Sequence, residues 1–223
     1  MPSDDLYDRT LSTDTIYHIF NRGVAKQPLF QDERDYQHLL LCLSYYLEES
    51  PSSRLSHVLR TRKTREQLQQ PIQAPLVTVH AYALMPNHFH LVVGQQRDNG
   101  ISTWLRRALN SYSRYYNVRR HRVGPMFQGP FRFVRIGGDD QFLHITRYTH
   151  LNPVVAKLSA NARSYQWSSM DTILSGAPTR LCDPALTLSM IGSPERYEEF
   201  VNDHAGYASS IAHYQHLLHD ELD

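Results

Sequence analysis

The chain has few cysteines and no long apolar run. Its 223 residues include two cysteines, Cys42 and Cys182, which lie far apart and lack any paired metal-binding spacing. This usage offers no disulfide framework, so both thiols are expected to be reduced and structural. No apolar stretch is long enough to span a bilayer, and the N-terminal MPSDDLYDRT is polar and acidic, unlike a signal peptide. These absences predict a cytoplasmic protein.

Acidic residues are missing from one part of the chain and concentrated in another. Residues 183–223 hold eight acidic residues against one arginine, whereas residues 101–138 contain no Asp or Glu. The asymmetry indicates a polyanion-binding face and a separate acidic segment, which we expect to lie over the basic surface and restrain binding. Arginine interleaved with aromatic residues suits phosphate binding and base stacking, although a basic helix face can also be merely solvated. The candidate DNA-binding residues are Arg106, Arg107, Arg114, Arg119, Arg120, Arg122, Arg132 and Arg135.

The order of periodic segments predicts an α+β fold. Alternating or β-branched runs predict strands at 15–23, 76–84, 88–94 and 126–136, and helical spacing predicts helices at 32–49, 101–120 and 139–152, the last stopped by Pro153. We expect an antiparallel sheet with helices packed on one side, within a domain of residues 1–169. Residues 50–75 form an exposed insertion, and residues 170–223 a small, mostly helical acidic extension. The basic residues of the insertion belong either to an added DNA-binding arm or to a solvated helix.

A pair of histidines lies inside the apolar run LMPNHFHLVV. Because side chains alternate along a strand, His88 and His90 share one face and Phe89 points into the opposite layer. The run from Leu91 to Val93 shows no alternation, which indicates a strand covered on both faces, where neutral imidazoles need partners. We expect His88 and His90 to bind a metal ion; the alternative is two histidines on a solvent face.

A late helix offers two further candidates. Tyr148 and Asn152 in QFLHITRYTHLNP are four residues apart and lie on one helix face. If that face meets the histidines, two imidazoles and one amide oxygen suit Mg²⁺ or Mn²⁺ acting on a phosphodiester, with the Tyr148 phenol as nucleophile. A tyrosine hydroxyl has a pKa near ~10, so activation has to come from polarising the phosphate. The alternatives are a core tyrosine and an asparagine that caps its helix before Pro153.

Several motifs together resemble a known family. YHIFNRG, AYALMPNHFHLVV, GPMFQGPF, RYTHLNPVVA and YQWSS occur in the order seen in single-tyrosine HUH transposases, specifically the REP-associated tyrosine transposases. The resemblance covers about residues 13–169. It implies a ferredoxin-like fold, His88, His90 and Asn152 as metal ligands, and Tyr148 forming a 5′-phosphotyrosine link. It also implies single-stranded DNA with hairpins or palindromic repeats as the substrate.

The sequence also departs from the family pattern and leaves rivals open. Pro130 stands where relatives commonly have arginine, although Arg132 lies nearby. One rival is a domesticated hairpin-DNA-binding protein that does not cut, and another is a hydrolase with a water nucleophile, for which no acidic base is visible near the histidines. One tyrosine for each site is compatible with a monomer making sequential cuts or a homodimer making simultaneous ones.

Overall fold

The structure of the protein is a computed structural model that describes residues 11–60 and 70–203. Four antiparallel strands form one sheet in the order β2-β3-β1-β4. The strands are β1 (Ile16–Arg22), β2 (Val77–Met85), β3 (His88–Gln95) and β4 (Arg132–Arg135). The helices are η2 (Val24–Lys26), α1 (Glu33–Tyr45), α2 (Leu55–Val58), α4 (Gly100–Arg119), α5 (Asp139–Val155), α6 (Met170–Ser175), α7 (Ala185–Ile191) and α8 (Pro194–Asn202). The predicted α+β class is confirmed, and the β-α-β-β-α-β order with this strand order is ferredoxin-like.

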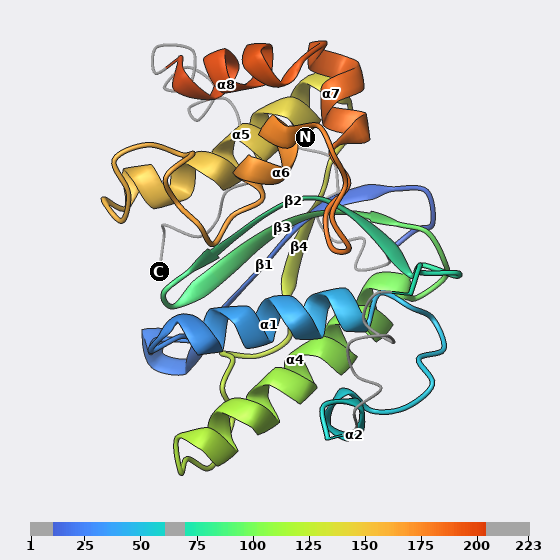
Figure 1. The fold of residues 1–223 in the computed structure, drawn as a ribbon, viewed down its shortest axis with the longest axis vertical. Coiled ribbons are helices and arrows are strands. Elements are labelled where there is room, and N and C mark those ends of the chain that lie inside the picture. The colour runs from blue at the N-terminus through green and yellow to red at the C-terminus, as the bar shows by residue number, and fades with distance from the viewer. Residues whose placement is uncertain (1–10, 61–69, 204–223) are drawn as a thin grey trace, which may run out of the picture.

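Helices cover both faces of the sheet (Figure 1). Helices α1 and α4 lie on one face, as expected for the ferredoxin-like unit, and α5 packs on the other face against β2 and β3. The prediction of helices on one side only was therefore wrong. The physical reason is visible in β3, where every residue from Phe89 to Gln95 is buried, so both faces of this strand need a covering layer.

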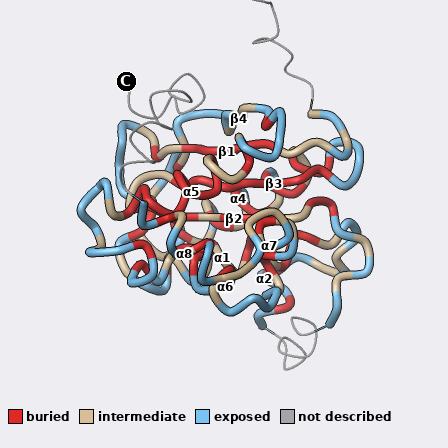
Figure 2. Tube along the Cα trace, turned by 90° about the horizontal axis from the view of Figure 1, so that it is seen from above, coloured by how far each residue is buried: buried red, intermediate tan, exposed pale blue. Residues whose placement is uncertain are grey.

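Alternation along β3 sorts its side chains between the two layers. Phe89, Leu91 and Val93 belong to the large apolar cluster formed with α1 and α4. Val92 belongs instead to a smaller cluster with Phe142 and other residues of α5. A register shift in the β2–β3 pairing between Val79 and Ala81 marks a bulge in β2. Figure 2 shows the buried core running along the strands between these two layers.

The hairpin that carries the histidines is confirmed. Met85 pairs with His88, so Pro86 and Asn87 are the only residues between the two strands. The backbone carbonyl of Pro86 accepts a hydrogen bond from Leu29 N at 2.7 Å, which fixes the turn against the segment that precedes α1. This places the start of β3 beside the end of β1, where Arg22 pairs with His88.

Residues around the predicted insertion are partly anchored in the core. Within the described part of 50–75, α2 buries Leu55 and Val58 completely against the large cluster. The Tyr45 hydroxyl donates to Ser53 O at 2.7 Å. These two apolar side chains anchor α2 to the core, while the other described residues of 50–75 are exposed or half-buried, so the exposed insertion stays a prediction. Three of the basic residues of the insertion, at 62, 63 and 65, lie outside the described residues, so both the DNA-binding arm and the solvated helix stay open.

The helices that follow α5 pack on it. Leu151 of α5 shares a buried cluster with Ile173 of α6 and with Tyr197 and Val201 of α8. His150 of α5 forms a 2.6 Å hydrogen bond with the Tyr197 hydroxyl. The described part of the acidic extension therefore lies in the α5 layer, on the opposite side of the sheet from α4 (Figure 1). The idea that it covers the basic helix is wrong for residues 183–203; residues 204–223 lie outside the described residues.

Candidate functional site

His88 and His90 lie side by side on the face of the sheet that α5 covers. Their ring centroids are 5.0 Å apart and their planes are nearly perpendicular, at 86°. His90 is completely buried, whereas His88, the first residue of β3 after the hairpin turn, is half-buried. The predicted shared face is present, with Phe89 on the other side of the strand.

Helix α5 brings Tyr148 to these histidines. The Tyr148 ring lies edge-on to the His90 ring, with centroids 5.4 Å apart and an angle of 89° between the planes. Tyr148 is 4% exposed, and its neighbours in the small cluster include Val92. As the alternative of a core tyrosine expects, the Tyr148 ring is packed in the interior. The same packing holds the ring against the imidazole of His90.

Asn152 lies one helical turn beyond Tyr148 and does not cap the helix. Its backbone carbonyl accepts a hydrogen bond from Ala156 N at 2.9 Å, and α5 continues to Val155. The predicted stop at Pro153 was wrong, because the missing N–H of a proline removes one hydrogen bond near the end of the helix without ending it. Asn152 is buried, and its Nδ2 has no hydrogen-bond partner among the described residues. The side chain is thus not used for capping.

A third histidine, missed in the sequence, completes the cluster. His18 of β1 is completely buried, and its Nε2 lies 3.0 Å from Nδ1 of His90. The two rings are stacked, with centroids 5.3 Å apart and an angle of 7°. The Tyr148 ring stands edge-on to His18 as well, at 5.9 Å. The signal in YHIFNRG is a histidine within a strand of mostly apolar residues, but its meaning depends on the pairing of β1 with β3.

Both histidines of the motif are neutral at physiological pH. Burial, with added repulsion from the nearby Arg22 guanidinium, lowers the pKa of His88 to about 4. Burial also holds the pKa of His90 well below its ordinary value, with added repulsion from His88, His18 and Arg22. Neutral imidazoles can bind a cation without first losing a proton, so the protonation state suits metal ligation.

The residue types of the expected site, two neutral imidazoles and one amide oxygen, are compatible with a divalent cation. Within residues 11–60 and 70–203, no group of three or more His, Cys, Asp or Glu side chains is arranged to hold a metal ion. A site here would therefore depend on His88, His90 and Asn152, whose buried side chain does not cap the helix. Such a site leaves coordination positions for water and phosphate oxygens, which Mg²⁺ and Mn²⁺ commonly retain.

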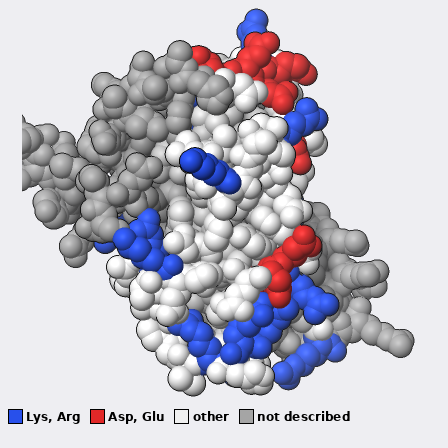
Figure 3. All heavy atoms as spheres, turned by 90° about the vertical axis from the view of Figure 1, so that its left-hand side faces the viewer, with Lys and Arg blue, Asp and Glu red and all other residues white. Residues whose placement is uncertain are grey.

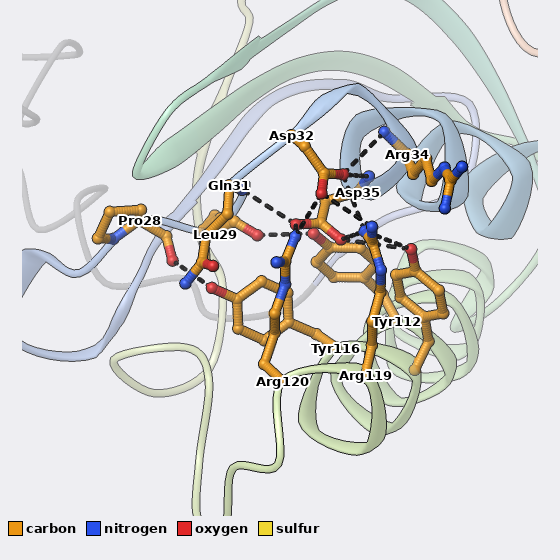
Figure 4. Close-up of polar contacts among 11 residues, drawn as sticks. Pro28, Leu29, Gln31, Asp32, Arg34, Asp35, Tyr112, Tyr116, Arg119 and Arg120 are labelled. Carbon is orange, nitrogen blue, oxygen red and sulfur yellow. Dashed lines mark hydrogen bonds and ion pairs between the residues drawn. The ribbon is translucent and has the colours of Figure 1, made fainter.

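Two of the eight candidate arginines are engaged by acidic residues (Figure 4). Arg119 and Arg120, at the end of α4, both contact the carboxylates of Asp32 and Asp35 at 2.6 to 2.8 Å. Asp35 is completely buried in α1, and Asp32 caps the start of that helix by accepting from Arg34 N. The hydrogen bonds from Arg119 hold the pKa of Asp32 far below its ordinary value. These two arginines tie α4 to α1.

The other six candidates differ in how far they reach solvent. Arg107 donates to the Glu49 carbonyl at 2.7 Å and Arg122 to the Pro125 carbonyl at 3.1 Å, and both are half-buried. The exposed candidates are Arg106, Arg114, Arg132 and Arg135. Figure 3 shows most Lys and Arg side chains of one face in its lower part, beside an acidic group, and most Asp and Glu of that face at its upper end, where some basic side chains also lie. The charge asymmetry of the sequence is thus also an asymmetry of the surface.

A pocket of about 510 Å³ opens between α4 and the loop that precedes β4. Its lining includes the exposed Arg106, the polar Asn21 and Asn110, and the aromatic Phe127 and Phe131. Asn21 is the neighbour of Arg22 in β1, so this pocket and the histidine cluster lie at the same end of that strand. A cation, amides and aromatic rings around one hollow suit an unpaired nucleotide.

The comparisons with known proteins bear on the fold. A solved structure of a REP-associated tyrosine transposase bound to a REP hairpin matches with a TM-score of 0.53 and 15% sequence identity. The match covers 78% of this chain and 88% of the other. No protein-family model and no curated protein matches the sequence. At this identity the likeness shows a shared fold. None of the described helices is long and apolar enough to cross a membrane.

Proposed function

We propose that this protein is a metal-dependent single-stranded DNA endonuclease and strand transferase that acts at hairpin or palindromic repeat DNA. The observation that carries the proposal is the placement of Tyr148 edge-on to His90, which itself lies beside His88. The buried Asn152 lies one helical turn further along α5. The fold shared with a transposase bound to a DNA hairpin supports it. In this proposal Tyr148 is the nucleophile, and His88, His90 and Asn152 hold Mg²⁺ or Mn²⁺.

The proposed reaction exchanges one phosphate ester for another. The Tyr148 hydroxyl oxygen bonds to phosphorus and loses its proton, while the bond from phosphorus to the 3′ oxygen breaks and that oxygen leaves as a 3′-hydroxyl. The product is a 5′-phosphotyrosine ester. Because this ester replaces a diester of similar energy, a second 3′-hydroxyl can reverse the step and join strands without ATP. The divalent ion, when bound, would polarise the phosphate and stabilise the leaving oxygen.

The protein's own residues position the DNA. Packing of α5 on β2 and β3 holds the Tyr148 ring still, which reduces the entropy lost in reaching the phosphate. Arg22 places a positive charge beside His88, where it favours approach of a phosphodiester. We expect an unpaired nucleotide near the cleavage site to enter the pocket beside Arg106, and the exposed Arg114, Arg132 and Arg135 to contact the backbone.

The test is capture of the covalent intermediate on DNA hairpins from the flanks of the protein's own gene. Each strand is labelled at its 3′ end, because a 5′-phosphotyrosine ester retains the 3′ segment, and is incubated with Mn²⁺ or EDTA before denaturing electrophoresis. We expect a metal-dependent adduct with the wild type and none with Tyr148→Phe. The matched control is Tyr82→Phe, which removes a tyrosine hydroxyl from β2. Tyr82 pairs with Leu91, so its side chain lies on the face of the sheet opposite Tyr148.

The outcomes separate the rival functions. Adduct formation by Tyr148→Phe would refute the assignment of the nucleophile, and cleavage without any adduct would favour a water nucleophile. Hairpin binding with no cleavage by the wild type would favour the domesticated DNA-binding protein. A strand labelled at its 5′ end should instead release a free fragment with a 3′-hydroxyl, which checks the polarity of the link.

A further inference from the structure

Each histidine of the HFH motif has its Nδ1 atom held by a neighbouring side chain. His88 Nδ1 lies 2.7 Å from Asn87 Oδ1, and His90 Nδ1 lies 3.0 Å from His18 Nε2. A neutral imidazole carries one N–H, and only the other nitrogen has a lone pair for a metal ion. The partner of Nδ1 therefore decides whether Nε2 can be a ligand.

The hydrogen bonds of Asn87 fix the arrangement at His88. Asn87 Nδ2 donates to the Lys26 carbonyl at 3.4 Å, which identifies Oδ1 as the atom that faces His88. An amide oxygen can only accept, so His88 Nδ1 must donate. The lone pair of His88 is consequently on Nε2.

The pair formed by His18 and His90 allows two arrangements. Either His18 Nε2 donates to His90 Nδ1, which puts the His90 proton on Nε2, or His90 Nδ1 donates to His18 Nε2. Only the second arrangement leaves Nε2 of His90 able to bind a cation, and it matches the arrangement at His88. Both rings are completely buried, so water cannot easily replace a lost partner.

We propose that His18 and Asn87 are positioning residues that place the protons of His90 and His88 on Nδ1 and so prepare both Nε2 atoms for a divalent cation. The metal part of this inference rests on the proposed function, whereas the position of the protons can be measured without metal. His18 acts from β1 and Asn87 from the hairpin turn, so the pairing of β1 with β3 and the two-residue connection are themselves parts of the site. Such outer partners fix the tautomer and ring orientation of histidine ligands.

The first experiment measures the tautomers directly. Two-bond ¹H–¹⁵N spectra of the metal-free protein, with assigned imidazole resonances, distinguish a proton on Nδ1 from one on Nε2. We expect His88 and His90 to carry it on Nδ1. In His18→Leu, which removes the acceptor, His90 should move toward the Nε2–H form; in His18→Gln, whose amide oxygen can accept at the Nε2 position, it should stay as in the wild type.

The second experiment measures Mn²⁺ affinity by calorimetric titration of the same proteins without DNA. Loss of such an outer partner should weaken Mn²⁺ binding by ~10–100-fold in His18→Leu and in Asn87→Ala. His18→Gln should bind closer to the wild type, which a purely space-filling role for His18 would not require. Thermal unfolding of each variant shows that the comparison is made between folded proteins.

The two measurements distinguish failure of this inference from failure of the proposed function. Wild-type Mn²⁺ affinity in folded His18→Leu would overturn the positioning role while leaving a metal-dependent function intact. A wild type with Nδ1–H tautomers and no Mn²⁺ binding would count against the metal-dependent function but retain the tautomer assignment. A wild-type His90 protonated on Nε2 would overturn the inference whatever the affinity.

Discussion

The two faces of the sheet are covered by helices in different ways. Toward α1 and α4, β3 presents Phe89, Leu91 and Val93 to a cluster of 28 buried hydrophobic residues among those the structure describes. Toward α5, the same strand presents His88 and His90, and the corresponding cluster has six such residues. The alternation of one strand thus assigns most apolar burial to one layer and the histidines of the candidate site to the other. This separation lets the site keep buried polar groups that a core supporting stability alone would not need.

The largest expected effect comes from the apolar face. Trp104 of α4 is completely buried and donates from Nε1 to the Leu43 carbonyl at 2.8 Å. Trp104→Ala should lower the free energy of unfolding by about 3–5 kcal/mol, since it leaves a large cavity. Urea denaturation followed by circular dichroism measures the loss. Val118→Ala on the same helix is the control, because Val118 is 72% exposed and its truncation should change little. Equal losses in both variants would contradict the account of this layer.

A slightly smaller effect is expected where α1 and α4 are joined. Asp35 is completely buried and accepts hydrogen bonds from Arg119, Arg120 and Gln31 N. Asp35→Ala should lower the free energy of unfolding by about 3 kcal/mol, because two guanidinium groups lose their shared buried partner. Glu49→Ala is the control, since its ion pair with Arg97 is exposed and should contribute at most about 1 kcal/mol. If Asp35→Ala instead left stability unchanged and strengthened DNA binding, Arg119 and Arg120 would belong to the DNA surface after all.

The two layers can also be compared by their response to acid. Burial lowers the pKa of His80, which packs against Phe142 of α5, to about 4. The unfolded chain takes up a proton at this histidine near pH 6.5, before the folded protein does. Its contribution to stability is therefore complete above that pH and is lost as the pH falls toward about 4, by up to about 1.4 kcal/mol for each pH unit.

The measurement is the free energy of unfolding between pH 7 and pH 4.5. His80→Gln should reduce the slope with pH relative to the wild type, whereas Val118→Ala, which removes no titratable group, should leave it unchanged. His38, whose pKa burial lowers to about 4 in the layer of α1 and α4, gives the corresponding test on the other face. An unchanged slope in His80→Gln would show that this histidine does not resist protonation in the folded protein.

The sequence predicted the local features better than the long-range ones. Alternation in HFHLVV placed His88 and His90 on one face, and the four-residue spacing placed Asn152 one turn from Tyr148, because both periods are properties of the backbone. The contact of His18 with His90 could not be predicted, since it depends on the register between β1 and β3, and the two residues are more than 70 positions apart in the sequence. The engagement of Arg119 by Asp35 was missed for the same reason: counting charges along 101–138 does not show an acidic partner in α1.

The smallest expected effect concerns DNA affinity and tests whether the pocket belongs to the site. Arg106 is exposed at the pocket, so Arg106→Ala should leave stability unchanged and weaken binding of a fluorescent single-stranded hairpin by about 1 kcal/mol, or several-fold. The dependence of log affinity on log salt should also become shallower by about 0.7, because one phosphate contact fewer releases fewer counterions.

Arg163→Ala is the matched control: Arg163 is also exposed, but its ion pair with Glu198 places it in the layer of α8. Anisotropy titrations at several salt concentrations compare the two variants. Equal weakening by both would mean that the DNA responds to overall charge, whereas a selective loss in Arg106→Ala would show that the DNA contacts the pocket, which lies on the α4 side of the sheet, opposite Tyr148.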